Sequence, residues 1–268
     1  MHHGRRFVKT ATECYVCGFT RLLFDEAHLI PARRTVARTL LVLALIPPSL
    51  VPAGCARGQA VPEGATSVGE WTNLLDGSAS VWRGYKMDSL PSGWRFDAAT
   101  SELTRASGGG DIITRAQYGD FEMDLEWKVG TGGNSGIFYR ATEGTDIIYK
   151  NAAEMQILDN AGHRDGRNAL TSTGSSYGLY APGADVSRPV GEWNQVRIVA
   201  IGPHIEHWLN GTKVVQYEMG SAEWRARVQA TKFSQWPAYG QSRSGHIGLQ
   251  DHGDVVWFRN IRIRELHR

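Results

Sequence analysis

The chain has 268 residues, of which 29 are lysine or arginine and 27 are aspartate or glutamate, giving a formal net charge of +2. The charge is spread unevenly: the first 54 residues carry seven basic and three acidic residues, and the rest carry 22 and 24. The larger part is therefore slightly acidic, which gives no electrostatic basis for binding nucleic acid or an anionic membrane surface. We expect neither as a partner.

An export signal is predicted before Cys55. Arg33, Arg34 and Arg38 precede the apolar run LLVLALI at residues 40–46, and small residues precede Cys55. This order is typical of a secretory signal, and the run is shorter than the ~20 apolar residues of a membrane-spanning helix. The Ala-Gly-Cys ending resembles a bacterial lipobox. We therefore expect lipidation of Cys55, and a periplasmic or cell-surface protein that contacts the membrane through its lipid alone.

The expected domain organisation follows from this signal. Because a signal belongs at the N-terminus, residues 1–54 read as an extension from an early start codon followed by the signal. Residues 55–70 are rich in Gly, Ala and Pro, which is typical of a flexible tether. Residues 71–268 contain no cysteine, so we expect a single domain held by its apolar core.

The first clear strand is FEMDLEWKV at residues 121–129, which alternates apolar and charged residues without interruption. Its charged face aligns Glu122, Asp124 and Glu126. Aligned carboxylates supply the nucleophile and acid of some jelly-roll glycosidases, so ordinary glycan hydrolysis through Glu122 and Glu126 is one hypothesis. The alternative, which we favour, is the solvated side of an amphipathic strand.

Two polar segments come next, GNSGIFYR at residues 133–140 and EMQILDNAGHRDG at residues 154–166. On the strand period, Glu154 and Gln156 share one face, and apolar residues take the other. A carboxyl and an amide side by side suit a sugar, whose hydroxyls both donate and accept hydrogen bonds. The alternative is a solvated outer face of the sheet.

Three further elements are predicted in order: a strand at residues 193–200, a hairpin at 205–217 around an Asn-Gly turn, and a short helix at 221–230. The chain has nine tryptophans, and we expect most of them to fill the core. Trp208, on the polar face of the hairpin, is the candidate platform for a sugar ring.

The segment GHIGLQDHGDVVWFRN at residues 245–260 is the last polar segment. If its apolar residues point inward, Gln250 and His252 lie on the opposite face, with Asp251 and Asp254 beside the histidine. Nearby carboxylates favour a protonated histidine, which would serve as acid, base or ligand near neutral pH. The alternative is a structural turn histidine.

With a final strand at residues 255–266, the many strands and glycine-rich loops predict an all-β sandwich or jelly roll. The chain also resembles the 3-keto-disaccharide hydrolase family. The motifs that carry this resemblance run in order over about 200 residues: WTNLLDG at 71–77, GNSGIFYR at 133–140, EMQILDN at 154–160, GEWNQVRI at 191–198, HIEHWLNG at 204–211 and GHIGLQDHGDVVWFRNIRIREL at 245–266. Val255 departs from the family, which commonly has proline there.

The resemblance implies a concanavalin-like jelly roll of two curved antiparallel sheets, with a cleft on the concave face. It also implies cleavage of disaccharides or glycosides already oxidised at C3. The ketone acidifies the C2–H, so a base can remove that proton and expel the C1 oxygen, after which water adds back. We assign Glu154 and His252 as base or acid. The residues expected to hold substrate are Arg140, Gln156, Trp208, Gln250 and Asp254.

No cofactor is required by the sequence. A divalent cation would polarise the ketone as a Lewis acid, and its candidate ligands are Asp159, His163 and Asp254. A non-catalytic carbohydrate-binding module is the alternative hypothesis outside the enzymes, since a fold does not determine a function.

The catalytic hypothesis requires that the Glu154 side chain shares one hollow with residues 250–252.

Overall fold

The computed structural model describes residues 61–268. The expected export signal, the expected lipidation site at Cys55 and the first part of the expected tether lie outside the described residues. Among the helices of residues 61–268, none has both the length and the apolar character needed to cross a membrane.

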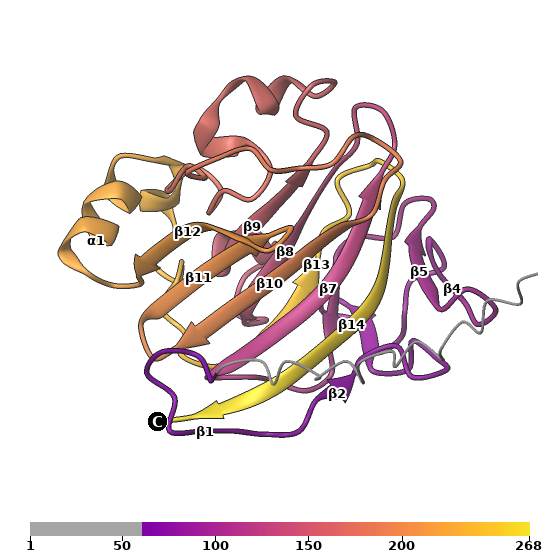
Figure 1. The fold of residues 1–268 in the computed structure, drawn as a ribbon, viewed down its shortest axis with the longest axis horizontal. Coiled ribbons are helices and arrows are strands. Elements are labelled where there is room, and N and C mark those ends of the chain that lie inside the picture. Colours follow the sequence, from indigo (N-terminus) through magenta and orange to yellow (C-terminus); the bar gives the residue numbers. More distant parts are fainter. Residues whose placement is uncertain (1–60) are drawn as a thin grey trace, which may run out of the picture. The chain divides into compact units, whose positions relative to one another are not determined.

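Two antiparallel sheets pack face to face (Figure 1). The larger sheet has the order β12-β11-β10-β7-β14-β5-β4, with β1 and β2 also paired to β14. Its strands are β1 (Ser67–Val68), β2 (Thr72–Asn73), β4 (Trp94–Asp97), β5 (Glu102–Arg105), β7 (Phe121–Val129), β10 (Asn194–Ile201), β11 (His204–Leu209), β12 (Thr212–Glu218) and β14 (Val256–His267).

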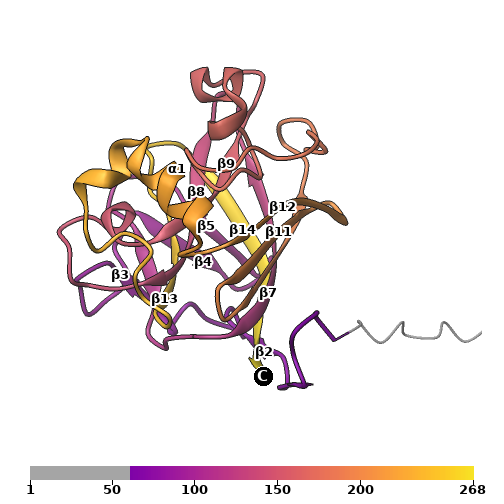
Figure 2. The same ribbon diagram turned by 90° about the vertical axis from the view of Figure 1, so that its left-hand side faces the viewer.

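The smaller sheet has the order β3-β6-β13-β8-β9. Its strands are β3 (Trp82–Gly84), β6 (Ile112–Thr114), β8 (Asn134–Ala141), β9 (Ala153–Leu158) and β13 (His246–Leu249). Figure 2 shows the layers from the side, with β7, β11, β12 and β14 on the right and β3 and β13 on the left. The expected all-β sandwich is confirmed.

Alternation along the strands builds the core between the sheets. Phe121, Met123 and Leu125 of β7 are buried in the same apolar cluster as Met155 and Ile157 of β9. Each such side chain contributes roughly 1.5–3 kcal/mol through burial. Because these residues point inward, their polar neighbours along the strands must point outward, away from the sandwich interior.

The helical segments are short and follow or connect strands. The predicted helix is confirmed as α1, where Ser221 Oγ accepts a hydrogen bond from Trp224 N at 3.1 Å and caps the first turn. Trp224 then stacks on Tyr239 with 6.0 Å between ring centroids. The helical segments are α1 (Ala222–Gln229), η1 (Ile148–Lys150), η2 (Arg164–Arg167), η3 (Ala169–Thr171) and η4 (Lys232–Gln235).

The tether expected over residues 55–70 is ordered at its C-terminal end. Thr66 N and Gly69 N each donate to a backbone carbonyl of β14 at 2.8 Å, and Val68 packs against a small apolar cluster of the larger sheet. The composition of residues 55–70 did not predict this pairing with β14, because the contacts are made mainly by backbone atoms, which every residue type carries.

Candidate active site

A cavity of about 100 Å³ lies at the outer face of the smaller sheet. It brings together residues 154–156 of β9 and residues 250–252, which follow β13, as the catalytic hypothesis requires. These segments are far apart in sequence and meet because β8 lies between β9 and β13. The cavity is lined by Asn134, Tyr149, Glu154, Gln156, Asp165, Tyr177, Lys232, Phe233, Gln250 and His252.

The position of the Glu154 side chain depends on a glycine in the neighbouring strand. Glu154 pairs with Phe138 of β8, and Gly136 pairs with Gln156. The Glu154 carboxyl lies across Gly136, where a Cβ atom would come within 2.7 Å of Glu154 Cδ. Gly136, the second glycine of the GNSGIFYR motif, therefore leaves room for the Glu154 carboxyl.

The Glu154 carboxyl is buried, and no cation of residues 61–268 lies close enough to form an ion pair with it. Burial raises the pKa of Glu154 to about 8, the charge of Asp111 adds to the rise, and Lys232 opposes it. Oε1 has no hydrogen-bond partner among the described residues. At neutral pH this carboxyl is therefore mostly protonated and holds a proton that it can donate.

Three amide side chains around Glu154 present buried atoms without partners in the described part of the chain. These are both polar atoms of Gln156, Oε1 of Gln250 and Oδ1 of Asn134. A buried polar atom left unpaired costs about 1–3 kcal/mol. A ligand rich in hydroxyl groups would satisfy these donors and acceptors together.

His252 lies at the exposed rim of the cavity, beside His163 at 5.9 Å between ring centroids. Partial loss of solvent and the neighbouring His163 lower the pKa of His252, against the opposing charges of Asp254 and Asp165. The ring is consequently neutral at neutral pH and can accept a proton. The site therefore pairs a protonated carboxylic acid with a neutral imidazole.

Lys232 was absent from the sequence predictions. Its Nζ lies 4.9 Å from the ring centroid of Tyr177, 5.3 Å from that of Tyr149 and 5.5 Å from that of Phe233. These aromatic faces hold the ammonium at the cavity. Among the described residues it has no carboxylate within salt-bridge distance, so its charge is available to a substrate.

The sequence predictions also missed Asn134, Tyr177 and Asp111. Asn134 begins β8 within a motif that had been singled out, so its position was a usable signal. Asp111 precedes β6, and burial raises its pKa to about 6. Tyr177 comes from the loop after η3. No periodic pattern in the sequence connects either residue to β9.

The predicted metal ligands do not assemble. Asp159 accepts three backbone N–H bonds of 2.8–3.1 Å. Burial would raise its pKa, but these bonds outweigh burial and lower it. Asp254 Oδ2 accepts the backbone N–H of Asn134 at 3.1 Å, and His163 Nδ1 accepts that of Asp165. Within residues 61–268, no three His, Cys, Asp or Glu side chains are grouped to hold a metal ion.

Arg140 does not line the cavity, contrary to prediction. It has φ of 54° next to a register shift between β8 and β13, so strand alternation does not predict its direction. Its guanidinium is buried, donates to the carbonyls of Gly119 and Gly202 at 2.9 and 2.7 Å, and pairs with Asp120 at 3.3 Å. Arg140 therefore joins loops at the edge of the sandwich.

Trp208 is also separate from the cavity. It lies on β11 of the larger sheet, where its Nε1 donates to Glu206 Oε2 at 2.8 Å. Strand alternation placed Trp208 on a polar face correctly. It did not reveal that this face belongs to the other sheet.

The charged row of β7 lies on the outer face of the larger sheet and is neutralised by arginines. Glu122 is fully buried and lies 2.5 Å from each of two guanidinium groups, so the expected solvated face is wrong at this position. Every member of the row is paired: Glu122 with Arg197 and Arg264, Asp124 with Arg262, and Glu126 with Arg259. The row offers no free acid for ordinary glycan hydrolysis.

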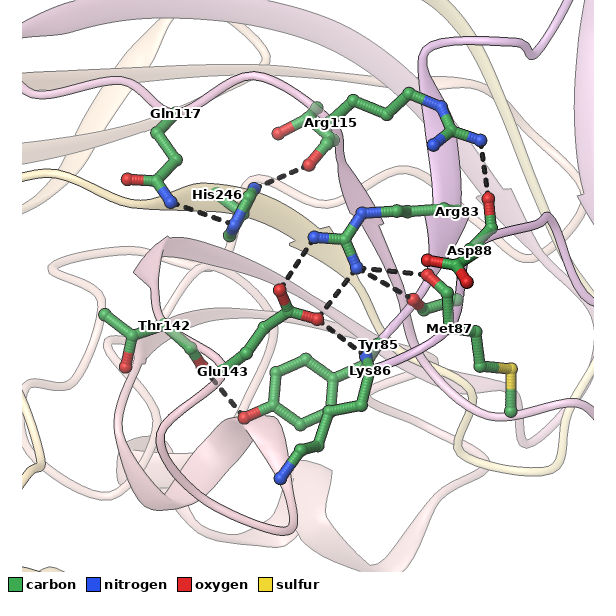
Figure 3. Close-up of polar contacts among 12 residues, drawn as sticks. Arg83, Tyr85, Lys86, Met87, Asp88, Arg115, Gln117, Thr142, Glu143 and His246 are labelled. Carbon is green, nitrogen blue, oxygen red and sulfur yellow. Dashed lines mark hydrogen bonds and ion pairs between the residues drawn. The ribbon is translucent and has the colours of Figure 1, made fainter.

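A second polar cluster gathers around Arg83 and Glu143 (Figure 3), close in sequence to η1, which carries Tyr149. Arg83 and Glu143 form a bidentate ion pair at 2.7 and 2.8 Å, and the Arg83 hydrogen bond lowers the pKa of Glu143 to about 2. Tyr85 Oη lies 2.8 Å from the Thr142 carbonyl. These contacts fasten the loop before η1, so we assign the cluster a structural role.

Comparison with known proteins identifies the family. The model of the 3-keto-alpha-glucoside-1,2-lyase-like domain matches residues 70–264. A 3-keto-disaccharide hydrolase of Bacteroides thetaiotaomicron is 36% identical over 227 residues, which cover 73% of this chain and 78% of that protein.

Solved structures agree with the fold. A crystal structure from Parabacteroides distasonis, of a protein provisionally named a glycosyl hydrolase, has 30% identity and a TM-score of 0.68, covering 73% of this chain and 94% of its own. A Bacillus subtilis protein with a galectin-like fold has 12% identity and a TM-score of 0.50, covering 76% and 99%. The jelly-roll fold is thus shared, and the chain belongs to the 3-keto-alpha-glucoside-1,2-lyase-like domain family.

Proposed function

We propose that the protein cleaves the glycosidic bond of 3-keto-disaccharides or 3-keto-glycosides by proton abstraction at C2, elimination and hydration. The observation that supports this proposal is the buried Glu154 carboxyl, which has no ion-pair partner in the described part of the chain and shares a cavity with His252 and with amide atoms that also lack partners there. Family membership supports the substrate class, because a relative is a 3-keto-disaccharide hydrolase.

The two protonation states suggest the roles. Neutral His252 takes the C2 proton, whose acidity the C3 ketone increases, and the electron pair forms a C1=C2 double bond. The bond from C1 to the leaving oxygen breaks, and Glu154 donates its proton to that oxygen. In the hydration step Glu154 takes a proton from water, the hydroxyl adds to C1, and His252 returns a proton to C2. Both residues regain their starting forms.

Lys232 and the amides would stabilise the charge that develops on the C3 oxygen during proton removal. The cavity of about 100 Å³ is smaller than the ~300–1,000 Å³ typical of whole small-molecule sites. We therefore place the oxidised ring in the cavity and the leaving sugar beyond its rim, near Tyr149 and Tyr177.

The roles can be separated with two substrates in heavy water. Glu154→Gln should lose at least about 100-fold in turnover of 3-keto-trehalose, yet still exchange the C2 hydrogen for deuterium. It should also cleave 4-nitrophenyl 3-keto-glucoside, whose leaving group needs no proton. His252→Ala should lose exchange and cleavage of both substrates. Full turnover by both folded variants would refute the proposed site. If His252→Ala kept C2 exchange and Glu154→Gln lost it, Glu154 would be the base and His252 the acid.

Unoxidised trehalose is the control that separates the other function classes. The proposal predicts sugar release from 3-keto-trehalose and none from trehalose. Release from both would favour ordinary glycan hydrolysis. Binding of 3-keto-trehalose without release would favour a carbohydrate-binding module.

We also propose that the protein is exported and anchored by a lipid at Cys55, which the sequence pattern of residues 33–55 supports. Metabolic labelling with palmitate in a bacterial host should mark the wild-type chain and leave Cys55→Ser unlabelled. An unlabelled wild-type chain would contradict this proposal.

A further inference from the structure

The outer face of the larger sheet carries a hollow on the side of the molecule away from the candidate active site. Two cavities of about 350 and 190 Å³ share Asp124 and Gln195 as lining residues. Trp71 borders the first cavity, and Trp208 borders the second. We refer to the joined cavities, from Trp71 to Trp208, as the outer groove.

Irregularities in the backbone occur at both ends of the outer groove. The pairing of β11 with β12 shifts register between His207 and Trp208. The pairing of β14 with β7 shifts between Arg259 and Arg262, where Asn260 has φ of 52°. Bulges bend a strand and re-aim its side chains, and they are frequent beside binding sites. The bulges thus account for a hollow in an otherwise regular sheet face.

A row of directly opposed residues forms the floor of the outer groove. Trp208 pairs with Arg197, Arg197 with Asp124, and Asp124 with Arg262. The row crosses three strand spacings of about 4.8 Å each, a span of roughly 14 Å. The Arg262 guanidinium lies 4.4 Å from the ring centroid of Trp71. The Arg197 guanidinium lies 5.4 Å from that of Trp208. These cations orient the two indoles.

The charges of the outer groove are already paired, which favours a neutral ligand. Asp124 and Glu126 are bound by arginines at 2.6 and 2.7 Å. The remaining groups are amides, because Asn73, Gln195 and Asn260 line the larger cavity. Asn73 uses its oxygen internally, and Asn260 uses its nitrogen. Among the described residues, the Asn73 amide therefore keeps its N–H donors free and the Asn260 amide keeps its oxygen acceptor free, a combination that matches sugar hydroxyls.

We propose that the outer groove binds a neutral glycan chain that lies across the strands, with sugar rings against Trp71 and Trp208 and hydroxyls bonded to the amides. The groove is longer than one sugar ring, so the ligand is an oligosaccharide or a polysaccharide segment. This site is separate from the cavity that contains Glu154, and its function is attachment to glycan while that cavity acts on small oxidised sugars.

Calorimetric titration with cellohexaose, xylohexaose, maltohexaose and laminarihexaose tests the proposal. At least one of these neutral chains should bind the full chain. Trp71→Ala and Trp208→Ala should each weaken that binding about tenfold or more. Trp193→Ala is the matched control, because this half-buried tryptophan precedes β10, lies against Arg259 of the same sheet at 4.1 Å, and lines neither cavity. It should keep the wild-type affinity.

Glu154→Gln should also keep the wild-type affinity, which separates the outer groove from the candidate active site. Absence of binding by all four hexasaccharides would overturn the proposal. Unchanged affinity in Trp71→Ala and Trp208→Ala would overturn it as well, as would loss of binding in Glu154→Gln. Binding of polygalacturonate alone would contradict the neutral ligand class. None of these results depends on turnover of 3-keto-sugars.

Discussion

The outer faces of the two sheets both carry buried carboxylates in strands, but their partners differ. On the larger sheet, Glu122 lies between two arginines. On the smaller sheet, Glu154 lies over Gly136, and several amide atoms around it have no hydrogen-bond partner within residues 61–268. A paired carboxylate neutralises its neighbours and stabilises the fold, whereas an unpaired one keeps a raised pKa and a proton to exchange.

This contrast distinguishes structural from chemical carboxylates better than spacing does. In sequence, Glu122, Asp124 and Glu126 form the more regular string, and Glu154 is a single acid in a mostly apolar strand. In the structure, the carboxylates of the regular string are paired with arginines, whereas Glu154 lines an open cavity. The comparison can be tested at each of the two faces.

The largest expected effect is on stability at the larger sheet. Glu122→Gln leaves Arg197 and Arg264 without their shared counter-charge, which should lower the free energy of unfolding by about 3–5 kcal/mol. Turnover per folded molecule should not change. Urea denaturation measures the first quantity, and a 3-keto-trehalose assay measures the second.

Glu126→Gln is the matched control for that change. Its ion pair with Arg259 is partly exposed, so its loss should cost at most about 1 kcal/mol. Equal destabilisation by the two variants, or loss of turnover in folded Glu122→Gln, would contradict the distinction between the two faces.

The next effect is on activity at the smaller sheet. Gly136→Ala places a methyl group where the Glu154 carboxyl lies, so the carboxyl must move away from the cavity. We expect kcat/KM to fall about 100-fold, with a smaller change in stability because a side-chain end can yield. Gly130→Ala adds a methyl group in open space, and it should keep wild-type activity. Wild-type activity in Gly136→Ala would show that the observed carboxyl position is unimportant.

A smaller effect is expected at Lys232. Lys232→Met removes a positive charge that holds the pKa of Glu154 down, so this pKa should rise and the loss of activity at alkaline pH should shift to higher pH. We expect kcat to fall about tenfold through weaker stabilisation of the enolate oxygen. The pH–rate profile measures the shift of the alkaline limb separately from the fall in kcat. Lys232→Arg should restore most of the wild-type kcat and most of the wild-type pH dependence. If the alkaline limb of the pH–rate profile of Lys232→Met did not shift, the Lys232 charge would not influence the pKa of Glu154, contrary to this account.

Much of the fold was predictable because strand alternation and turn chemistry are local. The strand at 121–129, the Asn-Gly hairpin and the helix capped by Ser221 all lie where their patterns indicate. Alternation also predicted that Glu154 and Gln156 point away from the core. The resemblance to a known family supplied the two-sheet arrangement that local patterns leave open.

The misassigned and missed residues depend on long-range structure. Alternation shows on which side of a strand Trp208 lies, but not which of two sheets contains it. Arg140 itself has a positive φ, which breaks the alternation. Lys232 reaches the cavity from the first position of η4, where aromatic rings from separate segments hold it. Contacts between residues that are distant in sequence leave no periodic pattern in the sequence from which they could be predicted.

The most direct test of the account is the titration of Glu154 itself. Carbon-13 NMR of glutamate side chains, with Glu154→Gln to assign the signal, should show a carboxyl with a midpoint at about pH 8. The same midpoint should appear on the alkaline side of the pH–rate profile, because turnover requires the protonated carboxyl. A midpoint near the ordinary value of 4.5 would mean that Glu154 is ionised at neutral pH, and it would contradict its role as the proton donor.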